Sequence, residues 1–171
     1  MRRVFGITGW KNSGKTTLTE KLVTELVARG WTVSTVKHAH HDFDIDKPGA
    51  DSFRHREAGA TEVAIVSGRR WALMHELRGE KEPTLDDILA RLAPADIVLV
   101  EGYKREAHRK IEARRLEARD RTPLSANDPN IVAVAADFAI EDEKLPVFDL
   151  NDTKSIADFV EQITGLGAQT K

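Results

Sequence analysis

The sequence contains no cysteine, and that absence excludes several kinds of chemistry. Disulfides, zinc–thiolate sites, iron–sulfur clusters and cysteine nucleophiles all need this residue. Long apolar runs are missing too, since no stretch approaches the roughly 20 residues that span a bilayer. The apolar run near the first residue is too short for a signal peptide. We therefore expect a cytoplasmic protein with no membrane partner.

The sequence also lacks the excess of positive charge that nucleic-acid-binding proteins normally carry. Lys and Arg number 26 against 28 Asp and Glu, so the formal net charge is -2. No nucleic-acid partner is therefore expected. A chain of 171 residues is long enough for one hydrophobic core. We predict a single domain over residues 1–165, followed by a frayed tail over residues 166–171.

Hydrophobic periodicity predicts strands that alternate with helices. The predicted strands cover residues 4–8, 31–36, 61–67, 71–77, 96–101, 131–135 and 146–150. The predicted helices cover residues 16–29, 51–58, 84–92 and 153–163. This alternation indicates an α/β fold in three layers, with a mostly parallel central sheet and helices on both faces.

Residues 9–16, with the sequence GWKNSGKT, match the pattern G-x-x-x-x-G-K-[ST] between a predicted strand and an amphipathic helix. Such a loop turns its N–H groups toward an anion at the helix N-terminus. The motif in this context therefore predicts a P-loop NTPase fold. Lys15 would neutralise the β- and γ-phosphates, and the Thr16 hydroxyl would bind Mg²⁺. The residues expected to contact the nucleotide here are Gly9, Lys11, Asn12, Ser13, Gly14, Lys15, Thr16 and Thr17.

Phosphate-binding loops usually have an acidic partner at the end of a neighbouring strand. The most apolar predicted strand ends in Glu101, which Gly102 follows. We predict that Thr16 and Glu101 hold the metal, and that Lys15, Thr16 and Glu101 form the catalytic group. The alternative is an exposed acid at a strand end.

Four segments together resemble the MobB family of adaptor GTP-binding proteins in molybdopterin-guanine dinucleotide biosynthesis. They are residues 9–18, 36–49, 101–104 and 127–129, and the resemblance extends over about residues 3–160. It implies a homodimer that binds GTP and hydrolyses it weakly. It also implies partnership with the guanylyltransferase that joins GMP to molybdopterin, and with molybdopterin itself and the enzymes that receive the cofactor.

The resemblance also places the chain near a wider class that includes nitrogenase-type and metallochaperone GTPases. One position of this sequence departs from the pattern of that class. Many of that class carry a signature lysine five residues before the loop lysine, and this chain has Trp10 there. Lys11 comes one residue late, so we do not expect it to reach across a dimer.

A dense polar cluster follows the second predicted strand, with its residues at His38, His40, His41, Asp42, Asp44 and Asp46. Imidazole and carboxylate groups suit a transition metal, but a loop at this place can also contact the nucleotide as a switch segment does. A solvated polar loop is the third interpretation. We select His40, His41 and Asp42 as nucleotide-contacting residues.

Three further places carry candidate ligand-binding residues. Arg69 lies in a predicted tight turn, where it could approach phosphates or simply be exposed. The resemblance places Gly102 and Lys104 in the nucleotide cleft. Asn127 and Asp128 could read guanine, because a carboxylate accepts two N–H bonds from that base; an Asx-type turn is the competing interpretation.

Residues 104–121 carry eight Lys or Arg against four Asp or Glu. They predict either a charged solvent face with Glu–Arg pairs at helical spacing or a basic surface for a pterin phosphate or an acidic partner. Two other functions compete with the adaptor. A small-molecule kinase would use a phosphate loop with an arginine-rich lid, and a metallochaperone would hold a metal with the histidine cluster.

Overall fold

The computed structural model describes residues 2–39 and 43–167, which form two compact units. The first unit combines Met1–His38 with Ile88–Lys171, and the second is Ala39–Asp87. Since compactness does not say whether the units unfold together, the single domain expected over residues 1–165 stays a prediction. No helix in the described ranges has the length and apolar character to cross a membrane.

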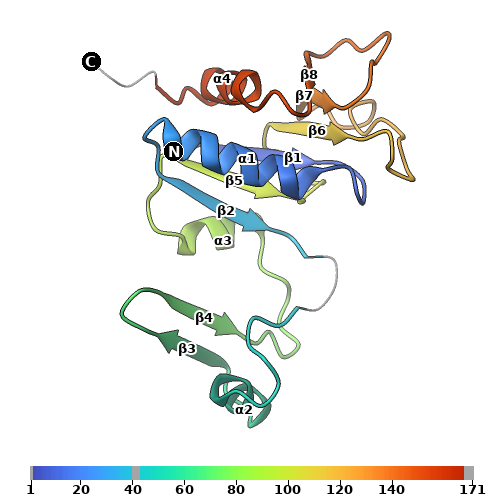
Figure 1. Ribbon diagram of the computed structural model, residues 1–171. Helices are drawn as coiled ribbons and strands as arrows, with labels where there is room; N and C mark the ends of the chain where they lie inside the picture. Colours follow the sequence, from blue (N-terminus) through green and yellow to red (C-terminus); the bar gives the residue numbers. More distant parts are fainter. Residues whose placement is uncertain (1, 40–42, 168–171) are drawn as a thin grey trace. The chain divides into compact units, whose positions relative to one another are not determined.

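The first unit contains a six-stranded sheet in which every neighbouring pair is parallel (Figure 1). Its strands are β1 (Val4–Thr8), β2 (Val33–Lys37), β5 (Ile97–Glu101), β6 (Lys110–Arg114), β7 (Ile131–Ala136) and β8 (Val147–Asp149). Their spatial order is β2-β5-β1-β6-β7-β8. This order places β1 between β5 and β6, and it confirms the predicted α/β fold with a mostly parallel sheet.

Helices α1 (Lys15–Ala28) and α4 (Thr153–Thr164) pack against one face of this sheet and against each other (Figure 1). Leu18, Leu22 and Leu26 form the buried stripe of α1 at helical spacing. Helix α4 begins after Asp152, which accepts a capping bond from the Ser155 amide at 3.2 Å. It ends at Gly165, and the next residue, Leu166, is buried in the core. Leu166, which we predicted to belong to a frayed tail, is therefore packed in the core, and residues 168–171 lie outside the described residues.

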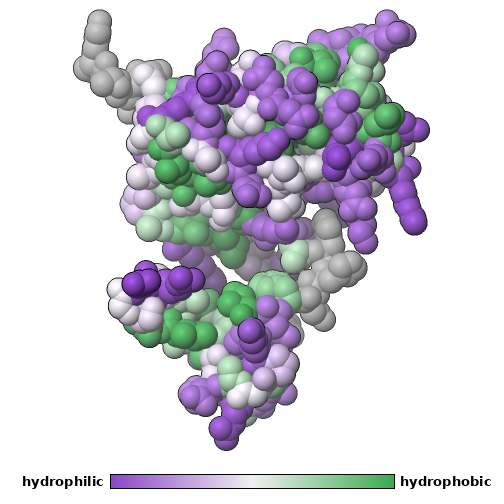
Figure 2. Space-filling model, viewed as in Figure 1, coloured by the Kyte–Doolittle hydropathy of each residue, from purple (hydrophilic) through white to green (hydrophobic). Residues whose placement is uncertain are grey.

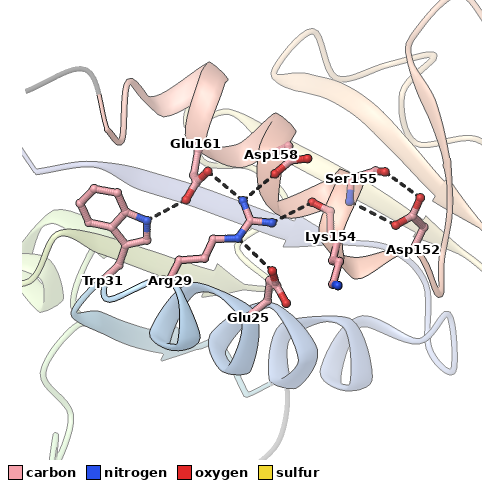
Figure 3. Close-up of polar contacts among 8 residues, drawn as sticks. All are labelled: Glu25, Arg29, Trp31, Asp152, Lys154, Ser155, Asp158 and Glu161. Carbon is pink, nitrogen blue, oxygen red and sulfur yellow. Dashed lines mark hydrogen bonds and ion pairs between the residues drawn. The ribbon is translucent and has the colours of Figure 1, made fainter.

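Arg29, the residue after α1, bonds to one carboxylate of α1 and to two carboxylates of α4 (Figure 3). Its guanidinium donates to Glu25 at 2.9 Å, to Asp158 at 2.6 Å and to Glu161 at 2.8 Å. Glu161 also accepts the indole N–H of Trp31 at 2.7 Å. Charge-assisted bonds of this kind are the stronger class of side-chain hydrogen bond, so they fix how the two helices lie on the sheet.

Strand β6 is the one strand of the sheet that the sequence analysis missed. Lys110, Glu112 and Arg114 are all buried, and they alternate with two apolar core residues. Their side chains meet backbone and side-chain partners from residues 104–106 and 124–125 and from Glu143. The centre of residues 104–121 is thus an internal strand, and the prediction of a charged solvent face there was wrong.

The second unit contains α2 (Asp51–Glu57) and the antiparallel hairpin of β3 (Glu62–Val66) and β4 (Trp71–His75). Figure 2 shows hydrophobic residues at the surface of this unit. Its exposed large apolar side chains include those of Val66, Trp71 and Leu73. Helix α3 (Leu85–Arg91) crosses the boundary between the units. It opens with a capping pair, since the Thr84 hydroxyl accepts the Asp87 amide hydrogen at 3.2 Å.

Candidate functional site

The loop of residues 9–16 joins the carboxyl end of β1 to the start of α1, as predicted. Gly9 has a φ of 146°, and a Cβ there would lie 2.6 Å from the Ala113 carbonyl oxygen and also collide with Ser13. Only glycine therefore fits this approach of two strands. Ser13 is 2% exposed, and its hydroxyl finds no hydrogen-bond partner among the described residues. A buried hydroxyl that the protein leaves unpaired calls for a partner from outside the chain.

A pocket of about 430 Å³ opens at the N-terminus of α1. Its lining residues are Asn12, Ser13, Gly14, Lys15, Thr16, Thr17, Arg115 and Glu117. The volume falls within the range of small-molecule sites, and a helix N-terminus favours an anion there. Six of the predicted contact residues thus share one pocket. Gly9 lies buried beneath the loop, and Lys11 is exposed.

Lys15 is the half-buried lysine of this pocket. Its ammonium donates a hydrogen bond to the Trp10 carbonyl oxygen at 2.7 Å, which holds the side chain along the loop. Burial lowers the pKa of Lys15, the Glu101 carboxylate opposes that effect, and the charges of Lys104 and Lys37 lower the pKa further. An anionic ligand would relieve both the burial and the repulsion.

The two residues predicted to hold the metal, Thr16 in the first turn of α1 and Glu101 at the end of β5, are in contact. We call them the metal-side pair. The Thr16 hydroxyl donates to Glu101 Oε1 at 2.8 Å, and Lys37 Nζ lies 3.3 Å from the same oxygen. Glu101 is only 7% exposed, so the alternative of an exposed strand-end acid was wrong. Two hard oxygen donors suit Mg²⁺, which takes few protein ligands and fills its shell with phosphate oxygens and water.

Lys37 is a residue of this site that the sequence analysis did not select. It is the last residue of β2 and pairs in register with Glu101, the last residue of β5. A lysine and an acid that end two predicted strands could have indicated this contact. The order of the strands would have to be known first, because the two residues meet only if their strands are neighbours.

Gly102 and Lys104, which the resemblance placed in the cleft, lie beside the loop. Gly102 has a φ of 93°, and a Cβ there would approach His38 Cβ to 3.1 Å. The Lys104 ammonium lies 4.1 Å from the centroid of the Trp10 ring, within the range of a cation–π contact. The Trp10 indole N–H also donates to the Thr122 carbonyl oxygen at 2.8 Å. The tryptophan at the signature-lysine position is therefore held in place by two contacts.

Arg115 and Glu117 are pocket residues that the sequence analysis missed. Both follow β6, which was not predicted because three of its five residues are charged. They line the pocket because β6 ends beside the loop. A Cβ at Gly14 would lie 3.1 Å from Arg115 Cδ, so the arginine stem packs closely on the loop.

Asn127 and Asp128 are not brought to the pocket. They precede β7 and lie at the edge where the parallel strands begin, whereas the loop lies where β1 ends. Asp128 Oδ1 accepts the Asn130 amide at 2.9 Å in an Asx turn, and Oδ2 accepts Lys110 Nζ at 3.1 Å. Burial raises the pKa of this carboxyl, but the bonds from Asn130 and Lys110 lower it below its ordinary value. The competing Asx-turn interpretation is the one that the structure supports.

The predicted residues His40, His41 and Asp42 lie outside the described residues. The later acids of the same cluster, Asp44 and Asp46, belong to the second unit, where both accept bonds from Arg56, at 2.9 and 2.6 Å. Hydrogen bonds from Arg56 lower the pKa of Asp46. Within residues 2–39 and 43–167, no group of three His, Asp or Glu side chains is arranged to hold a metal ion.

Arg69 also lies in the second unit, in the turn between β3 and β4. The turn is closed by the Ser67 amide, which donates to the Arg70 carbonyl oxygen at 2.9 Å, and Arg69 is exposed. An ordinary β-turn accounts for this geometry. Phosphate binding by Arg69 stays a prediction.

Comparison with known proteins identifies relatives over most of the chain. Residues 4–137 match the family MobB, described as molybdopterin guanine dinucleotide synthesis protein B. The molybdopterin-guanine dinucleotide biosynthesis adapter protein of Escherichia coli (strain K12) is 40% identical over 159 residues, covering 92% of this chain and 90% of that protein. The protein of that name from Haemophilus influenzae is 42% identical over 161 residues, covering 92% and 87%.

A solved structure extends the likeness to three dimensions. The crystal structure of the MobB protein homolog from Bacillus stearothermophilus matches with a TM-score of 0.72 at 34% identity, covering 95% of this chain and 98% of that one. The overall fold of this chain is therefore shared with that structure. The chain is a member of the MobB family.

Proposed function

We propose that this chain is a GTP-binding adaptor with weak GTPase activity that assists the attachment of GMP to molybdopterin. GTP would occupy the pocket at the start of α1 together with Mg²⁺. The observation that carries the proposal is the contact of Thr16 with Glu101 at the mouth of a loop that also presents Lys15 and a buried, unpaired Ser13 hydroxyl. A cation and oxygen ligands of this kind are the groups that a triphosphate with Mg²⁺ requires, and they support the proposal.

Each residue of the pocket then has a defined task. Lys15 and the N–H groups at the start of α1 bind the β- and γ-phosphates, and the Ser13 hydroxyl adds one neutral donor. The Thr16 hydroxyl and the Glu101 carboxylate would hold Mg²⁺, directly or through water. When bound, Mg²⁺ neutralises phosphate charge and orients the terminal phosphoryl group. Lys37 limits the negative charge of Glu101 before nucleotide binds.

Slow hydrolysis is part of the proposal. In fast GTPases an arginine finger or a water-positioning glutamine raises the rate by about 10³–10⁵. The described residues place no glutamine in the pocket, and the one arginine that lines it packs beside Gly14. A weak hydrolase suits an adaptor, whose bound nucleotide controls an association with another protein.

The adaptor role rests on membership of the MobB family and on the names of the Escherichia coli and Haemophilus influenzae relatives. The proposed protein partner is the guanylyltransferase that joins GMP to molybdopterin, with molybdopterin and recipient molybdoenzymes as further partners. We also propose a cytoplasmic homodimer. Sedimentation of the purified protein at several concentrations tests the dimer, and a monomer throughout would refute it.

The decisive experiment is calorimetric binding of GTP and ATP, each with Mg²⁺, to the parent protein and to Lys15→Ala. We expect GTP to bind more tightly than ATP, and Lys15→Ala to bind GTP much more weakly while melting like the parent. Lys154→Ala is the matched control, because Lys154 is an exposed lysine outside the loop and the pocket lining. Equal affinity for ATP would refute the guanine assignment, and an unaffected Lys15→Ala variant would refute the phosphate site.

A further inference from the structure

Arg115 occupies the pocket without belonging to the loop or to the metal-side pair. Its Nε donates to Asp137 Oδ2 at 3.3 Å, and Nη2 lies 3.5 Å from Glu117 Oε2. Asp137 is itself fixed, since its Oδ1 accepts the Leu116 amide hydrogen at 2.8 Å. No contact among the described residues uses Nη1 of this guanidinium. Asp137 and Glu117 therefore orient the side chain, and the guanidinium keeps N–H donors for a ligand.

The fold gives the pocket two distinct ends. Strand β1, which feeds the loop, lies between β5 and β6. Glu101 ends β5 and meets Thr16 on one side of β1, whereas Arg115 follows β6 on the other side. The same pocket extends from Lys15 and Thr16 to Arg115. The β6 side therefore offers room for the part of a nucleotide that precedes its terminal phosphates.

We propose that Arg115 binds the nucleoside monophosphate half of the ligand, through the α-phosphate and the adjoining nucleoside, and that Asp137 positions it. This inference rests on the proposed function, because it assigns a further residue of the same site. Arginine suits the task, since its planar fork can donate to phosphate and stack on a base. A purely structural role explains less: the side chain is 42% exposed, and exposed ion pairs add little stability.

A ligand series separates the two ends of the pocket. Calorimetry would measure GMP, GDP and GTP binding to the parent, Arg115→Gln, Lys15→Ala and Arg119→Gln. Arg119 is the matched control, because it is an exposed arginine of the same segment outside the pocket lining. We expect Arg115→Gln to weaken all three ligands by a similar factor of about 10 to 100, the usual effect of losing a charged hydrogen bond. Lys15→Ala should instead weaken GTP and GDP far more than GMP.

The outcomes distinguish this inference from the function on which it rests. If the parent binds GTP and Lys15→Ala does not, but Arg115→Gln behaves like the parent, the inference alone is overturned. A loss confined to GTP would place Arg115 at the γ-phosphate and would overturn it as well. A parent that binds none of the three ligands would overturn both.

The positioning role of Asp137 has its own measurement. Asp137→Asn should weaken all three ligands by a smaller factor than Arg115→Gln does. The double variant should bind no more weakly than Arg115→Gln alone, because Asp137 acts through the arginine. Additive losses with an unchanged melting temperature would show that Asp137 does not act by positioning Arg115.

Discussion

Thr16 and Glu101 lie 85 residues apart in the sequence, yet the threonine hydroxyl donates to the glutamate carboxylate at 2.8 Å. The contact forms because β1 and β5 are parallel neighbours, so the loop after one strand faces the last residue of the other. It joins the helix N-terminus to the acid in a single oxygen cluster. The proposed metal site depends on this pair.

Substitution of Glu101 by Gln should raise the Mg²⁺ concentration that GTP hydrolysis requires. The amide keeps a similar shape but removes the negative charge that attracts the ion, directly or through water. Loss of a group that holds or orients a metal shell reduces metal affinity by about 10- to 100-fold. Titration of hydrolysis with Mg²⁺ measures this effect. Glu106→Gln is the control, since Glu106 is exposed, and an unchanged titration in Glu101→Gln would contradict the assignment.

The affinity for GTP should fall at alkaline pH, beginning below the ordinary pKa of lysine. Burial lowers the pKa of Lys15 in the free protein, with Lys104 and Lys37 contributing. Bound phosphate favours the charged ammonium and raises that pKa again, so affinity is constant below the free-state pKa and declines above it. Binding measured across the alkaline range checks this.

Lys15→Arg supplies the control for that pH dependence, because a guanidinium stays charged throughout. Any ionisation of the nucleotide itself affects the parent and this variant alike. The decline should therefore be shallower in Lys15→Arg. Identical pH profiles for the two proteins would show that Lys15 is not the titrating group.

Replacement of Lys110 by Met should destabilise the first unit by about 3 kcal/mol, the lower end of the cost of breaking a buried ion pair. Lys110 is fully buried, and its ammonium donates to the carbonyl oxygens of Lys104 and Glu106 and to Asp128. Urea denaturation measures the change. Lys144→Met, at an exposed position, should change stability by no more than about 0.5 kcal/mol. Equal stabilities for the two variants would be inconsistent with this internal ammonium.

The protein should lose stability as the pH falls below about 6.5, the ordinary pKa of histidine, partly because of His108. Burial lowers the pKa of His108 to about 4, with the charge of Lys110 contributing and Asp128 opposing. The unfolded chain therefore binds a proton between these two pH values that the folded protein does not, and protonation favours unfolding. Denaturation at several pH values measures the slope. His108→Gln should show a smaller loss over this range, and a slope equal to that of the parent would contradict the role of His108.

The loop of residues 9–16, the strand before it and the helix after it could be read from local signals, because glycine geometry and apolar periodicity act over a few residues. Glu101 was found in the same way, as the acid that ends an apolar strand. Strand β6 was not found, because Lys110, Glu112 and Arg114 resemble a solvated surface when only neighbouring residues are considered.

By itself the sequence determined the loop, the alternation of strands and helices, and the resemblance to the MobB family. Only the tertiary structure decided which charged residues are buried, that Lys37 meets Glu101, that Arg115 enters the pocket and that Asp128 lies at the opposite edge of the sheet. The physical reason is that a charge can be buried only beside a partner. Lys110 finds its partners in the segments before and after β6, and Arg114 reaches Glu143 in the connection from β7 to β8. The order of the parallel strands sets which of these connections meet.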